Sequence, residues 1–213
     1  MLKELLECHK RELLESAIDP ERALAEDGVH TETDKRTINR ILGHERVASR
    51  LGACLVFPYF VDSEEPVLSR LKPLTPRKNT GGDPVKYESP RGARDPVAYL
   101  PRATREMLKA ERGSTDAIPS EIVFTEGEKK ARSLSQHGIY SIGLSGVWGF
   151  RRSGRHELTS ELQAIAWRGR RVVILFDSDI STNPKVDDAA RRLAQELRQV
   201  GAKVSMLRLA DSD

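Results

Sequence analysis

The chain is poor in cysteine and aromatic residues, and it has no long apolar run. Its two cysteines, Cys8 and Cys54, lack any paired spacing, so the sequence offers neither a zinc knuckle nor a disulfide framework. No apolar stretch approaches the roughly 20 residues that cross a bilayer, and no basic segment followed by an apolar stretch and a cleavage site opens the chain. We therefore expect a soluble cytoplasmic protein with no membrane partner.

The remaining composition indicates a folded protein with a basic middle section. Hydrophobic residues make up 38% of the 213 residues and aromatic residues 5%, which is enough for one lean core or two small domains. Residues 1–50 hold 9 basic and 11 acidic residues, whereas residues 66–112 hold 11 basic and 5 acidic residues. An excess of 6 positive charges (11 − 5) suits a polyanionic partner, and it equally suits an ordinary solvated surface.

Helical patterns occupy the first 50 residues. Apolar residues at helical spacing predict a helix over residues 2–16. A second helix is predicted from Pro20 to Glu26, because Asp19 is a suitable cap and proline suits the first helical position. Residues 34–50 give a third helix. We interpret residues 1–50 as a helical N-terminal region that serves packing or interaction.

The next section has the pattern of short strands and loops. Residues 53–61 and 67–71 are strand candidates, and prolines recur up to Pro101, which excludes long helices between them. This predicts a small basic β-rich subdomain over residues 51–115. Its lysines and arginines are candidates for phosphate contacts, with a plain solvated surface as the alternative: Arg70, Lys72, Arg77, Lys78 and Lys86.

Residues 116–213 alternate between strand and helix patterns. Strands alternating with helices of this length predict a parallel sheet flanked by helices, with right-handed crossovers, so the fold class is α/β. The predicted strands cover residues 121–125, 139–144, 171–176 and 203–209. The predicted helices cover residues 127–137, 158–167 and 185–200.

Acidic residues end two of these strands. Asp177 and Asp179 close one apolar run, and Glu126 closes another upstream. In a parallel sheet the carboxyl ends of the strands share one edge, where ligands bind. Three carboxylates at that edge suit a hard divalent cation, Mg²⁺ or Mn²⁺. The same acids are also typical of loop caps and helix starts.

Each of the other residues near the carboxyl ends of these strands has two possible interpretations. Gly127 permits a close approach of the backbone to a ligand, or it simply forms a tight turn. Lys129 and Lys130, in the first turn of the next helix, either reach a phosphate or face solvent. Asp187 is a candidate further metal ligand, and it also complements the dipole of the last helix. By contrast, Arg170 precedes a strand, so we expect it at the opposite edge and facing solvent.

Three runs together resemble a TOPRIM domain: Ile122-Val-Phe-Thr-Glu-Gly-Glu-Lys-Lys-Ala131, Ile142-Gly-Leu-Ser-Gly146 and Val173-Ile-Leu-Phe-Asp-Ser-Asp179. This is the catalytic domain of bacterial DNA primases, of type IA and type II topoisomerases and of some nucleases. The resemblance implies a TOPRIM domain over residues 116–213. It also implies that Glu126, Asp177 and Asp179 are its catalytic and metal-binding residues.

Upstream residues are similar to the basic subdomain that precedes TOPRIM in primases of the bacterial type. The similarity lies in Leu55-Val-Phe-Pro58 and Val85-Lys-Tyr-Glu-Ser-Pro90. It places Lys86 on a basic residue that borders the catalytic groove in that family. The ensemble most resembles the TOPRIM proteins of phages, plasmids and mobile elements of the DUF3854 type, which often accompany replication helicases.

The chain departs from these families at several positions. The zinc-binding domain that primases use to recognise the template is absent. Ser181 stands where topoisomerases have a third acid, and no strand-cleaving tyrosine motif is evident. Leu209-Ala-Asp-Ser-Asp213 resembles the start of a later acidic cluster of primases, so we expect the native protein to continue.

The resemblance implies Mg²⁺-dependent nucleotidyl or phosphoryl transfer on nucleic acid by a primase-like enzyme, in the DNA replication of a mobile element or phage. The expected partners are single-stranded DNA or RNA, nucleotide triphosphates and a replication helicase. Two alternatives remain open. One is a metal-dependent TOPRIM nuclease that uses the same acids with water as nucleophile. The other is a non-catalytic module that binds nucleic acid or a helicase.

Overall fold

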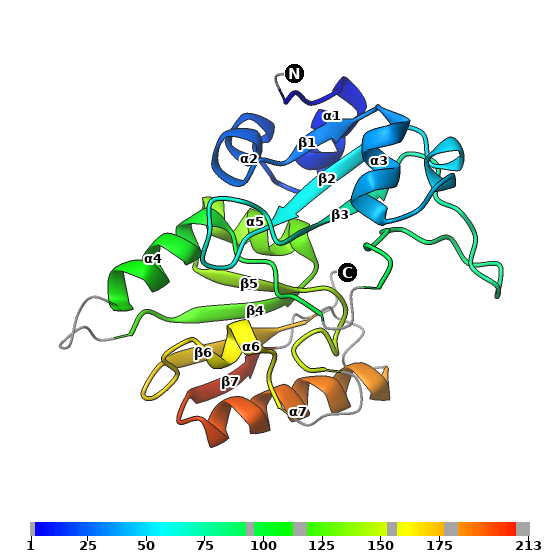
Figure 1. The fold of residues 1–213 in the computed structure, drawn as a ribbon. Coiled ribbons are helices and arrows are strands. Elements are labelled where there is room, and N and C mark those ends of the chain that lie inside the picture. The colour runs from blue at the N-terminus through cyan, green and yellow to red at the C-terminus, as the bar shows by residue number, and fades with distance from the viewer. Residues whose placement is uncertain (1–2, 93–95, 113–118, 153–156, 177–182, 208–213) are drawn as a thin grey trace, which may run out of the picture. The chain divides into compact units, whose positions relative to one another are not determined.

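The computed structural model describes residues 3–92, 96–112, 119–152, 157–176 and 183–207. The chain folds into two compact units, Met1–Arg94 and Asp95–Asp213, which we call unit 1 and unit 2 (Figure 1). Unit 1 contains a 3-stranded antiparallel sheet, and unit 2 contains a 4-stranded parallel sheet with helices on its faces. The α/β fold class predicted from the sequence is confirmed.

The sheet of unit 1 has the order β1-β2-β3. Its strands are β1 (His30–Glu32), β2 (Cys54–Tyr59) and β3 (Leu68–Pro73). β1 pairs with β2 only as far as Val56, so Pro58 lies past the end of β1. The amide hydrogen that proline lacks is therefore not needed on that side, which explains how a proline is tolerated in the central strand.

The helices of unit 1 are α1 (Glu7–Glu15), α2 (Pro20–Asp27) and α3 (Lys35–Leu42), followed by the 3₁₀ helix η1 (Val47–Arg50). Asp19 caps α2 as predicted, accepting hydrogen bonds from the backbone of Glu21 and Arg22. The helix predicted over residues 34–50 is wrong in its length, because Gly43 adopts a left-handed conformation (φ 63°) that ends α3. β1 lies within residues 1–50, so that region shares a sheet with β2 and β3.

Both faces of this sheet are covered. Ile38 and Leu42 of α3 pack with Cys54, Val56 and Leu71 on one face. Side chains alternate along a strand, so the partners of Leu55 lie on the other face. Thr31, which pairs with Leu55, accepts a hydrogen bond there from the Leu6 backbone at 3.0 Å, and its Oγ1 lies 2.7 Å from His9 Nδ1 of α1. Burial raises the pKa of the Cys54 thiol to about 12, so Cys54 is a packing residue.

Unit 2 has the strand order β5-β4-β6-β7, all parallel. Its elements are α4 (Arg102–Arg112), β4 (Ile122–Glu126), α5 (Glu128–Gln136), β5 (Ser141–Leu144), α6 (Ser160–Gln163), β6 (Arg171–Leu175), α7 (Pro184–Gln199) and β7 (Lys203–Leu207). The four predicted strands are confirmed to within a few residues. The predictions missed α4 entirely, and the helix expected over residues 158–167 is reduced to α6.

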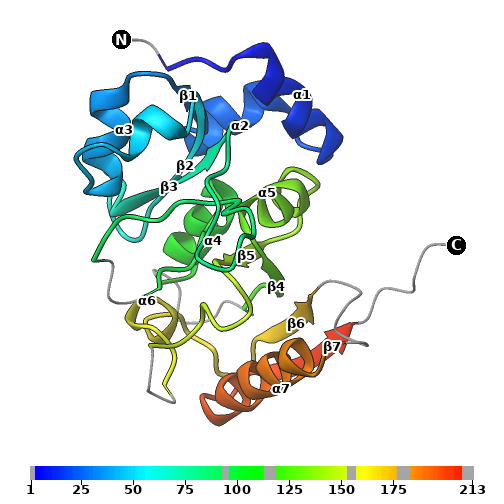
Figure 2. The same ribbon diagram turned by 90° about the vertical axis from the view of Figure 1, so that its right-hand side faces the viewer.

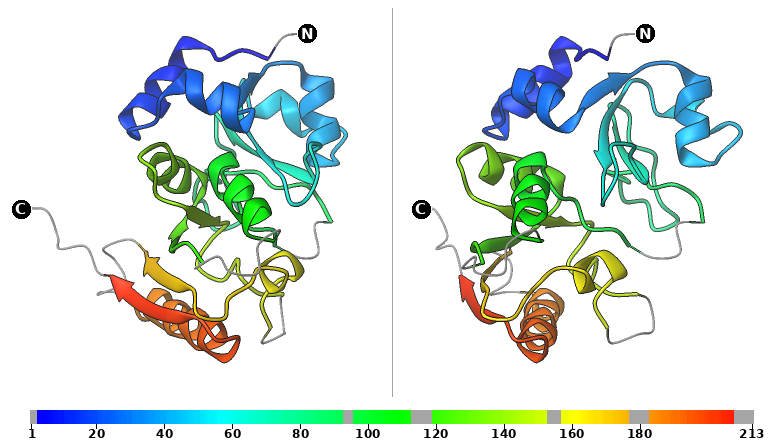
Figure 3. Two further views of the ribbon diagram at one scale, coloured as in Figure 1. Left: turned by 90° about the vertical axis from the view of Figure 1, so that its left-hand side faces the viewer. Right: turned by 60° about the vertical axis from the view of Figure 1, so that its left-hand side comes forward.

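The helices of unit 2 form two layers around the sheet. α7 runs along β6 and β7 (Figure 2) and buries Leu193 and Leu197 with Ile174 and Phe124. α4 and α5 lie on the opposite side of the sheet (Figure 3). On that side Thr104 of α4 exchanges hydrogen bonds with the backbone of Ser141, at 3.0 Å each way. β4 and β5 are therefore buried on both faces, as near-continuous apolar strands predict, whereas Val173 and Leu175 of β6 are only half-buried.

The two edges of the parallel sheet differ. Outside β5, Tyr99 and Gly143 exchange two backbone hydrogen bonds of 2.8 Å, so this edge is covered by a short antiparallel bridge. At the other edge β7 has alternating exposure, with Lys203 and Leu207 exposed. No other strand among the described residues pairs with the outer side of β7.

Arg170, which we expected to face solvent, is only 1% exposed, so that prediction is wrong. Its guanidinium donates to Glu111 Oε2 at 2.5 Å, to the Ser120 carbonyl at 2.7 Å and to the Ala166 carbonyl at 3.0 Å. It thereby joins the end of α4 to the segments that precede β4 and β6. Burial raises the pKa of Glu111, but hydrogen bonds from Arg170 and Ser120 lower it more, so its pKa lies below the ordinary value.

Replacing Arg170 with alanine should lower the free energy of unfolding by about 3 kcal/mol, because the substitution leaves the Glu111 carboxylate without its cation. Urea unfolding of the full chain measures this. Arg168→Ala, at an exposed neighbouring arginine, should change it by less than about 0.5 kcal/mol.

The same pair has a defined pH dependence. A carboxyl whose pKa is lowered by folding contributes stability at neutral pH that is lost as the pH falls below its unfolded value, 4.5. The difference between wild type and Arg170→Ala should therefore shrink below about pH 4.5. Equal stabilities of Arg170→Ala and wild type at pH 7 would contradict the role given to this ion pair.

Candidate functional site

Glu126 lies at the carboxyl end of β4, between the ends of two other strands. It pairs with Leu144 of β5, and the preceding residue Thr125 pairs with Leu175 of β6. The side chain is half-buried, and its Oε1 atom is buried. Phe176 follows β6, and the next residues in the sequence are the predicted ligands Asp177 and Asp179, which lie outside the described residues.

One carbonyl group connects the loops at the carboxyl ends of β4 and β5. The Leu144 carbonyl oxygen accepts hydrogen bonds from the Gly127 amide and from the Gly146 amide, both at 2.8 Å. Gly127 follows β4, and Gly146 belongs to the loop that follows β5. The chain segments leaving two neighbouring strands are therefore fixed to the same atom.

Gly127 forms the turn between β4 and α5, which was one of its two readings. Its backbone has φ 76° and ψ 166°, a combination that is essentially restricted to glycine. A Cβ atom at this position would meet nothing within 4 Å, so the requirement for glycine comes from the backbone conformation and not from crowding.

Gly143 of β5 allows this turn to lie close to the sheet. A Cβ atom at Gly143 would stand 2.5 Å from the Gly127 carbonyl oxygen and 3.1 Å from Ala131 Cβ. The Ser141 hydroxyl, on the same face of β5, donates to the Ala131 carbonyl at 2.7 Å. α5 is thus anchored against β5 directly beside Glu126.

Charged residues on α5 separate into a buried pair and an accessible pair. Glu128 and Arg132 are both 0% exposed, and their spacing of four residues puts them on one face of the helix. Lys129 is half-buried and Lys130 is exposed. Both lysines were candidates from the sequence, whereas the buried pair was not predicted. Its signal is a Glu-x-x-x-Arg spacing that brackets the core residue Ala131.

Asp187, the further metal candidate, lies in the first turn of α7 and forms an ion pair of 2.6 Å with Arg191. The adjacent Asp188 is exposed. Within the described ranges no three His, Cys, Asp or Glu side chains come together closely enough to hold a metal ion. Of the predicted triad only Glu126 lies in these ranges. Asp177 and Asp179 lie outside them, so the Mg²⁺ site predicted from the sequence stays a prediction.

The basic residues of unit 1 differ in their surroundings. Lys72 forms an ion pair of 2.5 Å with Glu12 of α1, and Arg77 forms one of 2.6 Å with Glu88, which is 5% exposed. These two cations are engaged within the fold, although the sequence presented them as candidates for phosphate contacts.

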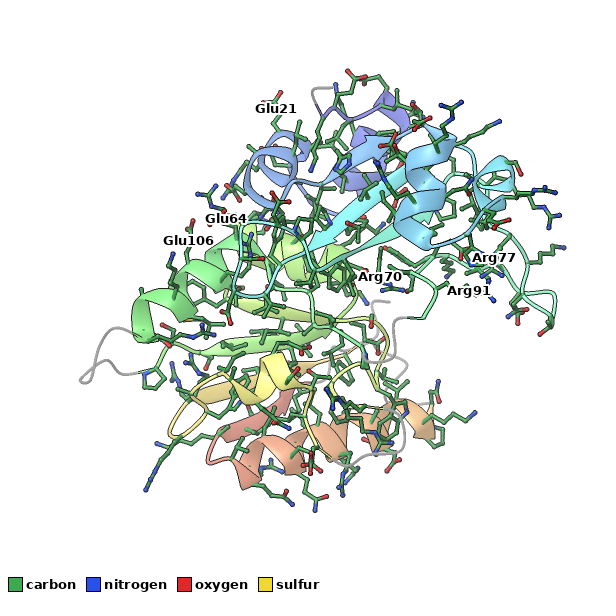
Figure 4. All side chains as sticks on the ribbon, viewed as in Figure 1. Glu21, Glu64, Arg70, Arg77, Arg91 and Glu106 are labelled. Atoms are coloured by element: carbon green, nitrogen blue, oxygen red, sulfur yellow. The ribbon has the colours of Figure 1, made fainter. Side chains whose placement is uncertain are left out.

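Arg70 is held next to them. Its guanidinium lies over the Tyr87 ring, 5.0 Å from the centroid, and Nε donates to the Ser89 hydroxyl at 3.0 Å. Leu71 and Glu88 form an antiparallel bridge, which puts this group beside β3. Figure 4 shows Arg70 with Arg77 and Arg91 on the same side of unit 1.

Three further cations are accessible. Lys78, Lys86 and Arg91 are exposed, and none of them forms an ion pair with any described residue. Lys78 belongs to a short hairpin closed by a hydrogen bond of 2.8 Å from the Val85 amide to the Arg77 carbonyl. Lys86 follows this hairpin directly. The candidate nucleic-acid surface of unit 1 therefore consists of the exposed cations Lys78, Lys86 and Arg91, together with Arg70.

Comparison with known proteins supports the assignment of unit 2. Residues 114–213 match the model of a family described as "Domain of unknown function (DUF3854)". This family is associated with TOPRIM domains, so the resemblance stated from the sequence is confirmed at that level for this part of the chain.

One curated relative matches across a longer part of the chain. An uncharacterized protein of Picosynechococcus sp. (strain ATCC 27264 / PCC 7002 / PR-6) is 30% identical over 162 residues, covering 58% of this chain. The match covers 15% of that protein, so this chain spans only a small part of its length. No solved structure matches the chain. No helix of the described residues is long and apolar enough to cross a membrane.

Substitution of Gly127 tests the turn beside Glu126. Gly127→Asn should lower the free energy of unfolding by about 1 to 3 kcal/mol, because no side chain is compatible with this backbone conformation. Gly28→Asn is the matched control. Gly28 has φ 66° and ψ 20°, a left-handed conformation that asparagine tolerates, so its effect should be smaller. Chemical denaturation of both variants provides the comparison, and equal losses of stability would argue against the special conformation of Gly127.

Proposed function

We propose that this chain is a primase-like TOPRIM enzyme that carries out Mg²⁺-dependent nucleotidyl transfer on nucleic acid, in the replication of a mobile element or phage. The observation that carries the proposal is the register of β4 and β6. Because Thr125 pairs with Leu175, Glu126 leaves β4 beside Phe176, and Asp177 is joined to Phe176 by a peptide bond. Neighbouring strands lie about 4.8 Å apart and consecutive Cα atoms about 3.8 Å apart, which supports the proposal that Asp177 and Glu126 act at one site.

The acids at this edge have the chemistry that phosphoryl transfer requires. Such reactions depend on positioning and charge neutralisation more than on covalent chemistry. Asp177 and Asp179 would hold Mg²⁺, and Glu126 would act as a further ligand or as the general base. When bound, Mg²⁺ stabilises charge on the attacking and leaving oxygens. The buried Oε1 of Glu126 and the fixed turn at Gly127 limit the freedom of this carboxylate, which favours a preorganised site.

Two features of unit 1 favour a primase-type activity on nucleic acid. Leu55-Val-Phe-Pro58 forms part of β2, and Lys86 lies exposed beside the Arg70–Tyr87 stack, in the stretch that resembles the basic subdomain of primases. Exposed cations with no carboxylate partner among the described residues are available for backbone phosphates. Tyr87 is half-buried and covered by Arg70, so we assign it to holding that arginine.

Activity measurements test the catalytic proposal. The full chain should polymerise labelled nucleotide triphosphates into primers on single-stranded DNA in the presence of Mg²⁺ or Mn²⁺. Chelation of the metal should stop the reaction. Asp177→Asn and Glu126→Gln preserve side-chain size, yet each should lower the rate more than about a hundredfold, since each removes a metal-binding charge worth several kcal/mol. Asp188→Asn, an exposed neighbour in α7, is the matched control and should retain activity.

The outcomes separate the competing functions. Cleavage of single-stranded DNA without primer synthesis, abolished in Asp177→Asn, would identify a nuclease that uses the same edge. Absence of both activities with either metal would overturn the catalytic proposal and leave a binding module. Full turnover in Asp177→Asn would overturn the assignment of Asp177 as a catalytic residue.

Binding measurements test the surface of unit 1 separately. Lys86→Glu should weaken binding of single-stranded DNA and lower the slope of log affinity against log salt by about 0.7, because one phosphate is no longer neutralised. Lys203→Glu makes the same charge change at an exposed position of β7 in unit 2, so it controls for net charge. Titrations at several salt concentrations by fluorescence anisotropy give both quantities. Identical slopes for wild type and Lys86→Glu would exclude Lys86 from the interface.

A further inference from the structure

The loop that follows β5 presents an arginine stacked on a tryptophan. The Arg151 guanidinium carbon lies 4.1 Å from the centroid of the Trp148 ring, within the range of a cation–π contact. Trp148 packs in turn against Phe150, with ring centroids 5.8 Å apart. Phe150 belongs to the buried core of unit 2, whereas Trp148 and Arg151 are both half-buried. The stack thus leads from the core to the surface.

The loop that carries this stack is closely fixed. The Gly149 backbone amide donates to the Gly146 carbonyl at 2.8 Å, and the Arg151 backbone amide donates to the Trp148 carbonyl at 3.3 Å. A Cβ atom at Gly149 would stand 3.0 Å from the Gly146 carbonyl oxygen, so the turn is tight. An antiparallel bridge from Arg151 to Leu158 holds the other end of the loop.

The position of the loop relates it to Glu126. The Leu144 carbonyl binds the amides of Gly146 and Gly127 together, so the loop starts at the edge of the sheet where Glu126 ends β4. Arg151 forms no ion pair with any described residue of the chain. A guanidinium held by an aromatic ring, and not by a carboxylate, keeps its N–H donors available for an external anion.

We propose that Arg151 is a phosphate-binding residue of unit 2 and that Trp148 is its positioning residue. The ligand class is a phosphate ester oxyanion, supplied either by a nucleotide triphosphate or by the backbone of a nucleic-acid strand. This inference rests on the proposed function, because it gives the site beside Glu126 a cation for the charge of its substrate. Planar N–H donors of arginine match two phosphate oxygens at once, and the stack on Trp148 sets their direction.

Intrinsic fluorescence gives a direct binding assay, because the chain has two tryptophans. Trp167 is 3% exposed and donates its indole N–H to the Leu162 carbonyl at 2.6 Å, so it should respond little to a ligand. Trp148 should report binding. The probes are ATP and a twelve-residue oligo(dT), each titrated into the full chain in EDTA. Measurement without metal makes the assay independent of catalysis.

For the probe that supplies the phosphate, Arg151→Ala should weaken binding about ten- to a hundredfold, as expected when charge-assisted hydrogen bonds are removed. Arg151→Lys should weaken it as well, since lysine keeps the charge but cannot form the planar stack. Arg168→Ala, an exposed arginine just before β6, should bind as wild type does. Which probe responds identifies the source of the phosphate.

Trp148 variants test the positioning role by anisotropy with labelled probes. Trp148→Ala should weaken binding about three- to tenfold, whereas Trp148→Phe retains an aromatic face and should restore most of the affinity. A purely structural role would lower thermal stability in both variants and would not distinguish them in affinity.

Equal affinity of wild type and Arg151→Ala for both probes, or absence of binding of either probe to wild type, would overturn the inference. These results are distinct from failure of the catalytic proposal. Activity that is abolished in Asp177→Asn but unchanged in Arg151→Ala would support the catalytic proposal and refute the phosphate site. Binding that depends on Arg151, without any turnover, would support the phosphate site and refute the catalytic proposal.

Discussion

The arrangement of the candidate site depends on one shared hydrogen-bond acceptor, the Leu144 carbonyl oxygen. It binds the first amide after β4 and the second amide after β5, so two loops begin from a common point. Gly127 supplies the backbone conformation that this requires, and Gly143 supplies the space, since any side chain there would strike the Gly127 carbonyl. Backbone hydrogen bonds and backbone conformation therefore fix where Glu126 and the Trp148 loop begin, independently of side-chain contacts.

Charge in this protein is divided between cations that stabilise the fold and cations that remain available. Arg170 and Lys72 are bound to carboxylates within their own units, and removing their charge would act on stability. Lys86 and Arg151 have no such partner among the described residues. The net charge of +3 therefore does not show which cationic side chains are available to bind an anion. Lys86 of unit 1 and Arg151 of unit 2 belong to the available set. Composition alone does not distinguish the two kinds of cation.

Local patterns were sufficient for the elements with strong short-range signals. β4 and β6 are short β-branched runs, and α7 begins with an Asn183 cap and Pro184, so both kinds of element were predicted close to their bounds. Partners distant in sequence decided the rest. Arg170 can be buried because it pairs with Glu111, which lies 59 residues upstream. Lys72 pairs with Glu12, 60 residues away in the sequence. β1 has only three residues and exists through its pairing with β2, which no local pattern records.

At the candidate site, too, local features were predictable and contacts across turns were not. The position of Glu126 followed from the parallel-sheet pattern, because the end of a predicted strand is itself a local feature. The roles of Gly143 and of the Trp148–Arg151 stack did not, because each depends on contacts across a turn that the sequence does not specify. The uneven edges of the sheet have a further consequence. Because the Tyr99 bridge blocks growth beyond β5, β7 is the edge strand at which another strand could add to the described part of the parallel sheet. Exposed Lys203 makes self-association there electrostatically unfavourable.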